Sequence, residues 1–152
     1  MTQTPAEQPP AQPADTTSAA TSTPFTDDEH GTLRSAAMLA SALVSRAEKG
    51  MFDSIKESFA ASKAIAGSPP QVAALVGKGG FPEVPKGTPE QVEARTLELL
   101  REAVTILRGK APELVDGYRA MVLDSCREAA AAADDTSGNE LAAIAKVESA
   151  LT

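Results

Sequence analysis

The spacing of apolar residues predicts helices from residue 27 onward. In the segment 27–47 they recur every three or four positions, as on one face of an α-helix, at Leu33, Ala37, Ala40, Val44 and Ala47. The segment 89–108 has the same period, at Leu97, Leu100, Val104 and Leu107. Two C-terminal segments also carry apolar stripes, at Leu114, Tyr118, Met121, Val122, Cys126 and Ala129, and at Leu141, Ile144, Val147 and Leu151. Each of these helices therefore has one side to bury.

Four short motifs indicate where helices begin. In each, a Ser or Thr side chain can cap a free amide, while the side chain of a Glu or Gln three residues later reaches back to the amide of that Ser or Thr. The four motifs are Thr26-Asp27-Asp28-Glu29, Ser68-Pro69-Pro70-Gln71, Thr88-Pro89-Glu90-Gln91 and Ser137-Gly138-Asn139-Glu140. Glycines supply most of the stops. Together these signals predict helices at about 27–47, 52–66, 69–77, 89–108, 112–132 and 138–151.

The same pattern predicts the fold class. No stretch alternates apolar and polar residues for long enough to form a sheet, and the Gly/Pro-rich loop 78–87 has no room for a paired strand. Phe81 and Val84 are expected to pin this loop to the rest of the domain. We therefore predict an all-α fold, a small bundle of about five to six helices formed by residues 25–152 as a single domain.

Residues 1–24 have a different composition. They hold five of the 11 prolines among Gln, Thr, Ser and Ala, and no aliphatic side chain larger than Ala follows Met1. Such a segment cannot bury enough surface to offset its chain entropy. We predict a disordered N-terminal tail, either a solubilising extension or a tether or docking peptide.

Composition and charge narrow the function classes. Aromatic residues are only 3% of the chain, so the core is expected to be aliphatic, and the net charge of −7 disfavours nucleic acid or an anionic membrane as a partner. A cationic partner stays open, and so does plain solubility. The N-terminal region lacks the charged and apolar parts of a signal peptide. We expect a protein of bacterial type that is soluble and cytoplasmic, with no membrane contact.

Few residues suggest catalysis. His30, the one histidine, follows an acidic helix start, where a surface position is expected, and Cys126, the one cysteine, lies on an apolar helix face. Lys78-Gly79-Gly80 lacks the spacing of a phosphate-binding loop. Asp53 and Glu57, four residues apart, are a carboxylate pair of the kind used in acid–base chemistry, but such a pair on an exposed helix is usually just a solvated face. We therefore expect no enzyme activity and no organic cofactor.

Two acidic turns remain as candidate chemistry. One follows Ala47 and the other follows Ala133, and a shift of 86 residues overlays Glu48 on Asp134 and Ile65 on Leu151, which indicates a weak internal repeat. Carboxylate oxygens without Cys or His suit only a hard cation, Ca²⁺ or Mg²⁺. The candidate metal ligands are Glu48, Asp53, Asp134, Asp135 and Glu140. The alternative is that these carboxylates cap helices and complement their dipoles.

The two turns resemble part of a known family. A helix, an Ala-Asp turn and a helix that begins with acidic residues are similar to the TerB-like family of bacterial helical-bundle proteins, associated with tellurite resistance and stress responses. The resemblance implies that the two turns face one another and can hold a divalent cation, with Glu48, Asp134 and Glu140 on or near acidic positions. This chain departs from the family where Glu48-Lys49 replaces Asp-Gly, and its second turn is one residue shorter.

Two main hypotheses follow from the sequence. The first is a non-catalytic helical module that binds a partner protein or assembles into a homo-oligomer. The second is a stress protein of TerB-like type that binds Ca²⁺ or Mg²⁺ through the two acidic turns. The distance between the Glu48 and Asp134 turns would separate a shared site from two independent helix caps.

Overall fold

The computed structural model describes residues 25–47, 63–77, 82–132 and 138–152. Its helices are α1 (Asp27–Arg46), α3 (Pro70–Gly77), α4 (Pro89–Lys110), α5 (Val115–Ala131) and α6 (Gly138–Ala150), with a 3₁₀ turn, η1 (Pro112–Leu114), before α5. Residues 63–67 are also helical. Strands are absent from these described ranges, and the predicted all-α class is confirmed. The predicted tail, 1–24, lies outside the described residues.

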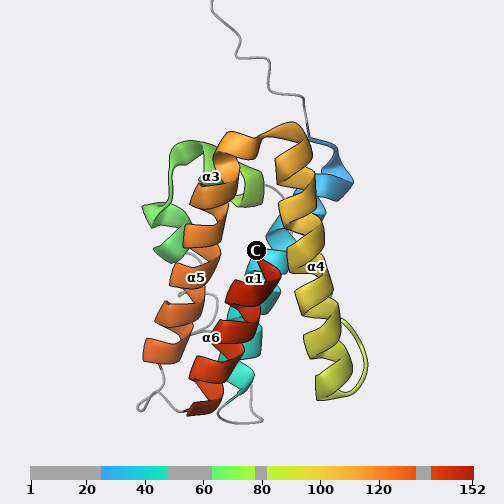
Figure 1. The fold of residues 1–152 in the computed structure, drawn as a ribbon, viewed down its shortest axis with the longest axis vertical. Helices are drawn as coiled ribbons and strands as arrows, with labels where there is room; N and C mark the ends of the chain where they lie inside the picture. Colours follow the sequence, from blue (N-terminus) through green and yellow to red (C-terminus); the bar gives the residue numbers. More distant parts are fainter. Residues whose placement is uncertain (1–24, 48–62, 78–81, 133–137) are drawn as a thin grey trace, which may run out of the picture.

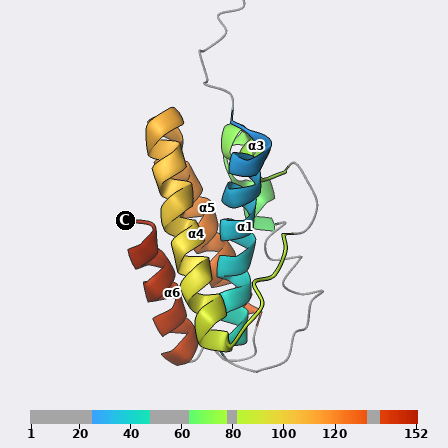
Figure 2. The ribbon, with the colours of Figure 1, turned by 90° about the vertical axis from the view of Figure 1, so that its right-hand side faces the viewer.

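Four of the helices form an antiparallel bundle. α1 and α5 run in one direction, and α4 and α6 run in the other (Figures 1 and 2). α1 packs mainly against α4 and α5, while α6 contacts α4, α5 and α1. α3 lies at one end of the bundle against α1 and α5. Short connections between α4, η1 and α5 enforce this antiparallel order because they leave no length for a crossover.

Two of the four predicted capping boxes are present in full. The amide of Glu29 donates to Thr26 Oγ1 (3.2 Å), and the amide of Thr26 donates to Glu29 Oε2 (2.8 Å). Thr88 and Gln91 make the same pair of bonds at the start of α4, at 3.3 and 2.9 Å. Each box satisfies amides that the first helical turn leaves without an intrahelical acceptor. These local sequence signals therefore fix where α1 and α4 begin.

The other two predicted boxes have different outcomes. The Ser68 hydroxyl donates to the carbonyl of Ile65 (2.6 Å), so it closes the preceding helical turn, and α3 begins at Pro70. Ser137 lies outside the described residues. A serine hydroxyl that follows a helix can satisfy a C-terminal carbonyl as readily as an N-terminal amide. The motif at Ser68 therefore marks the junction between two helices.

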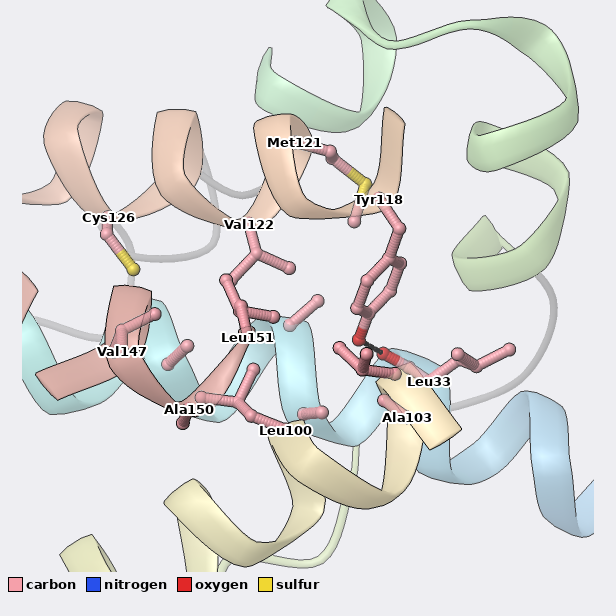
Figure 3. Packing of buried hydrophobic residues seen from close by; sticks show 14 of the residues in the cluster. Leu33, Leu100, Ala103, Tyr118, Met121, Val122, Cys126, Val147, Ala150 and Leu151 are labelled. Atoms are coloured by element: carbon pink, nitrogen blue, oxygen red, sulfur yellow. Dashed lines mark hydrogen bonds between the residues drawn. The ribbon is translucent and has the colours of Figure 1, made fainter. Parts of the chain in front are cut away.

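The core is aliphatic, as the composition predicted, and it has a single large aromatic at its centre. Tyr118 is fully buried, and its hydroxyl donates to the carbonyl of Leu33 across the bundle (2.7 Å). In Figure 3 the Tyr118 ring points from α5 toward Leu33, and side chains of α4, α5 and α6 gather beside it. The fully buried residues around them include Leu33, Ala36, Ala40, Val44, Leu100, Ala103, Leu107, Val122, Cys126, Val147 and Leu151. Short alanine side chains let these helices approach closely.

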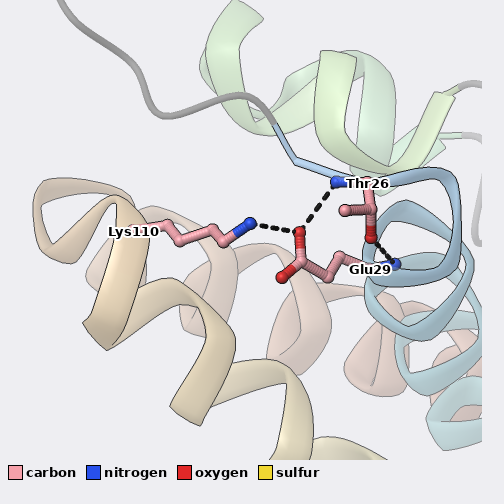
Figure 4. Close-up of polar contacts among 3 residues, drawn as sticks. All are labelled: Thr26, Glu29 and Lys110. Carbon is pink, nitrogen blue, oxygen red and sulfur yellow. Dashed lines mark hydrogen bonds and ion pairs between the residues drawn. The ribbon is translucent and has the colours of Figure 1, made fainter.

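Polar contacts join the ends of helices that are distant in sequence. Lys110, the last residue of α4, donates to Glu29 Oε2 at 2.6 Å (Figure 4), and its ammonium lies 5.9 Å from the centroid of the Phe25 ring. At the other end of α4, Lys146 of α6 pairs with Glu93 (2.6 Å). These contacts connect α4 to both the first and the last helix of the bundle.

The Glu29 carboxylate makes stability depend on pH. Its hydrogen bond from Lys110 and the amide of Thr26 lower its pKa below the ordinary value of 4.5. A carboxyl with a lowered folded-state pKa contributes stability above its unfolded pKa, and this contribution is lost as pH falls through the folded pKa. We expect Glu29→Gln to lower the thermal midpoint at about pH 7, and the difference from wild type to shrink as the pH falls below the ordinary pKa of 4.5 and through the lowered pKa of the folded state. Glutamine keeps the cap, as Gln91 does in α4, so only the charge is removed.

Thermal melts followed by circular dichroism at a series of pH values check this expectation. Glu102→Gln is a suitable control because Glu102 is an exposed carboxylate on the same helix as Lys110. A constant difference between Glu29→Gln and wild type at every pH would contradict it.

Gly117 lets α3 pack closely on α5. A Cβ at this position would lie 2.9 Å from Val72 Cγ2, and Val72 is almost fully buried. At Gly109, near the end of α4, an added Cβ would meet nothing within 4 Å. Alanine is a better helix former than glycine by up to about 1 kcal/mol, and overpacking costs about 1–3 kcal/mol. We therefore expect Gly109→Ala to stabilise the fold.

The paired variant Gly117→Ala should lower stability by about 1 kcal/mol, since the loss from overpacking exceeds the gain in helix propensity. Urea unfolding of both variants measures the two signs directly. Equal stabilisation by both would show that Val72 moves aside without cost.

None of the helices in the described residues is both long and apolar enough to cross a membrane.

Candidate functional site

The predicted metal ligands fall mostly outside the described residues. Glu48, Asp53, Asp134 and Asp135 lie in the undescribed ranges, and so do the Lys78-Gly79-Gly80 segment and Glu57. Glu140 is described, in the first turn of α6. In the part of the chain that the structure describes, no three His, Cys, Asp or Glu side chains are grouped closely enough to hold a metal ion. The distance between the two acidic turns is therefore not among the described features.

The structure reverses the predicted orientation of the first turn of α6. Leu141 was predicted to face the core, but it is 59% exposed, whereas Glu140 is 0% exposed. The buried positions of α6 are Glu140, Ala143, Val147 and Ala150, with Leu151 just beyond the helix. This stripe has the helical period, and it places residue 140 inward and residue 141 outward. The packing of α6 on three helices decides the rotation, so one leucine is left outside.

The helix end that precedes the first acidic turn and the helix start that follows the second lie at the same end of the bundle. α1 ends at Arg46 where α6 begins at Gly138, because the two helices run antiparallel (Figures 1 and 2). Glu140 is buried in the α6 turn at this end. This arrangement brings one predicted ligand and both helix ends to the same region of the bundle.

Cys126 and His30, the two candidates for nucleophilic chemistry, both lie where they serve the packing of the fold. Cys126 is fully buried, and burial raises the pKa of its thiol to about 12, so the thiolate is strongly disfavoured. His30 is partly buried. Its Nδ1 lies 3.0 Å from the carbonyl oxygen of Leu75, and the centroid of its ring lies 5.6 Å from that of Phe25. A carbonyl only accepts, so Nδ1 donates. His30 therefore fastens α3 to the start of α1, a role that the sequence did not predict.

A hollow whose lining residues are all described lies between α1 and α4. It has a volume of about 890 Å³, and the loop residues 83–86 form its third side. We call it the α1–α4 groove, and its lining residues are Asp27, Asp28, Gly31, Thr32, Ser35, Glu83, Val84, Pro85, Lys86, Arg95 and Leu99. The wall from α1 carries only short side chains, and a Cβ at Gly31 would meet nothing within 4 Å. Short residues on α1 therefore keep the groove open.

Part of the wall of the α1–α4 groove is apolar. Val84 is 53% exposed, although it was predicted to pin the loop, and with Leu39, Leu43 and Val92 it also borders a much smaller pocket. Leu99 is partly buried on the opposite wall. Val84 thus covers apolar residues of α1 and α4 with one side and faces solvent with the other. It is one of two exposed large apolar residues in the described chain.

A second hollow differs from the groove in its charges. It has a volume of about 590 Å³ and lies between residues 63–69 and α5. Its charged residues are already paired across or along the rim, Lys63 with Glu128 at 2.9 Å and Arg127 with Asp124 at 3.1 Å. Its charges are therefore less available to a ligand than those of the α1–α4 groove.

Sequence reasoning did not identify the groove. The available signal was the run of short residues Gly31, Thr32 and Ser35 on the side of α1 away from its apolar stripe, together with one valine in a Gly/Pro-rich loop. Neither feature is specific without knowledge of which helix lies beside α1. Comparison with protein-family models, curated proteins and solved structures finds no match to this chain.

Proposed function

We propose that this chain is a non-catalytic helical-bundle protein that works by binding a partner protein, with the α1–α4 groove as the contact surface. The observation that carries the proposal is the open groove of about 890 Å³ with the half-exposed Val84 on its wall. Exposed apolar surface rimmed by polar residues is typical of interaction sites. The proposal that the protein is not an enzyme is supported by the positions of Cys126 and Tyr118, both sealed in the core.

Substitution of Val84 tests the proposal. The wild-type chain is immobilised and exposed to a lysate of its source cells, in parallel with Val84→Asp and Leu141→Asp. A true partner is retained by wild type and by Leu141→Asp, and it is lost with Val84→Asp, because only Val84 lies at the groove. Melting curves establish that both variants remain folded, as expected for residues that are more than half exposed.

Light scattering on a sizing column tests whether the protein assembles with itself. A homo-oligomer that Val84→Asp dissociates would make the partner a second copy of this chain. A strictly monomeric protein that retains no partner from the lysate would refute an interaction function. Retention that is equal for all three proteins would show that the groove is not the contact surface.

A second candidate function is the binding of Ca²⁺ or Mg²⁺ at one end of the bundle, in a stress-response protein of TerB-like type. It is favoured by the common location of the α1 end and the α6 start, and by the buried Glu140 there. Carboxylate oxygens are ligands that these cations prefer. The ligands in this proposal are Glu48, Asp53, Asp134, Asp135 and Glu140.

Calorimetric titration of chelator-treated protein with Ca²⁺ and Mg²⁺ tests the second candidate. Heat of binding and a rise in the melting midpoint are expected, and both should be lost in Asp134→Asn/Asp135→Asn. Glu113→Gln/Asp116→Asn removes as much charge from exposed positions at the opposite end of α5 and serves as the control. No heat and no melting shift with wild type would rule out a cation site.

A further inference from the structure

We infer that the α1–α4 groove binds a segment of the partner protein that carries Lys or Arg next to an aliphatic side chain. This inference rests on the proposed function and specifies the chemistry of its partner. It is carried by three features of the groove, which are its apolar wall, its unpaired carboxylates and the space between them.

The apolar wall provides the contact for an aliphatic side chain. Val84 on the loop segment and Leu99 on α4 both line the groove, and Val84 is half exposed. Pro85 beside Val84 also lines the groove, so this part of the wall has a fixed backbone and little side-chain entropy to lose. Burial of Val84 by a partner removes apolar surface from water, at about 25 cal/mol per Å².

The charged wall selects for a cation. Three carboxylates line the groove, those of Asp27, Asp28 and Glu83, and within the described residues none of them forms an ion pair. The cations of the groove are Lys86 and Arg95, and Arg95 already pairs with Glu98 at 3.2 Å. The groove therefore has an excess of unpaired negative charge, which adds to the net charge of −7 of the whole chain. Both favour a basic partner and repel nucleic acid.

The position of the carboxylates matters as much as their number. Asp27 and Asp28 lie in the first turn of α1, where the helix dipole already stabilises negative charge. The helix dipole explains why Asp27 and Asp28 are tolerated at the start of α1. It does not account for Glu83, which comes from a different segment and lines the same groove. The short side chains of Gly31, Thr32 and Ser35 leave the space between these charges and the apolar wall unfilled. A long basic side chain can lie in this space with its charged end at the carboxylates.

Selection from random peptides tests the inference without a known partner. A phage-displayed library of random peptides of about twelve residues is selected on the full chain, and the enriched peptides are synthesised with a fluorescent label. We expect enriched peptides to contain Lys or Arg beside Leu, Ile or Val. We also expect amide chemical shifts to change on binding at Gly31, Thr32, Ser35 and Leu99 in the ¹⁵N-labelled protein.

The decisive variant is Asp27→Asn/Asp28→Asn/Glu83→Gln. It should weaken peptide binding by roughly tenfold at low salt, and the wild-type affinity should fall more steeply than that of the variant between about 50 and about 300 mM salt. The matched control Glu113→Gln/Asp116→Asn/Glu148→Gln makes the same change in net charge at residues outside the groove. Its affinity should stay within about twofold of wild type.

Several results would overturn the inference. These are an absence of enriched peptides, enriched peptides without basic residues, equal weakening by the two triple variants, and dissociation of a homo-oligomer by Val84→Asp. Peptides that bind at another surface would overturn the groove assignment while the proposed interaction function stands. Failure of the lysate experiment would refute that function separately.

Discussion

Tyr118→Ala should be the most damaging single substitution in the described part of this protein. Tyr118 is the largest fully buried side chain, and it lies where α1, α4 and α5 meet (Figure 3). Truncation of a buried aromatic to alanine costs about 3–5 kcal/mol, because it removes apolar contacts and leaves a cavity. Domains of this size have only about 5–15 kcal/mol of stability. We therefore expect a fall in the thermal midpoint of about 10–20 °C.

The conservative variant Tyr118→Phe separates packing from hydrogen bonding. It keeps the ring and loses only the bond from the hydroxyl to the carbonyl of Leu33 (2.7 Å). A buried neutral hydrogen bond contributes about 1 kcal/mol, so the phenylalanine variant should lose only this much. Denaturant unfolding measures the free energy of unfolding of both variants. The loss in Tyr118→Phe gives the contribution of the hydrogen bond, and the further loss in Tyr118→Ala gives that of the ring. Equal losses for the two variants would mean that the hydrogen bond, not the ring, dominates.

Leu100→Ala should have the second largest effect, with a loss of about 2–5 kcal/mol. Leu100 is fully buried on the face of α4 that points to α1 and α6. The neighbouring core positions are already short or stiff, among them Ala103, Ala150 and Val147, so little can move to fill the cavity. The loss should therefore lie above the lower end of this range. Calorimetry or chemical unfolding measures the loss.

Leu141→Ala is the matched control for Leu100→Ala. It makes the same chemical change on α6, at a residue that is 59% exposed, and it should alter stability by less than about 0.5 kcal/mol. The comparison also tests the rotation of α6. If Leu141 were inward, as its sequence pattern predicted, this variant would lose as much as Leu100→Ala.

The helices could be predicted because their signals are local. The predicted start of α1 matches the structure, and so does that of α4, because a Thr and an N3 Glu or Gln suffice for each cap. The apolar stripes of α1 and α4 were predicted well for a related reason, since long amphipathic segments have enough repeats to define a face. Ala47 and Leu97, at the margins of those stripes, are only partly buried.

The short helix α6 shows where this reasoning fails. Its stripe has few repeats, and Glu140 and Leu141 are adjacent, so a small rotation exchanges them. Residue type alone favours the leucine inside. The contacts of α6 with α4, α5 and α1 instead place Ala143, Val147 and Ala150 inward, and these fix the angle of the whole helix. Glu140 then follows into the interior.

What the sequence by itself determined was the all-α class, the starts of α1 and α4, the aliphatic core and the burial of Cys126. Only the tertiary structure decided the rotation of α6, the contact between His30 and Leu75, and the groove beside Val84. The physical reason is the distance along the chain over which the determining interactions act. Caps and periodicity act within a few residues, whereas each of the latter features depends on which helices lie side by side, and that is fixed by the packing of the entire bundle.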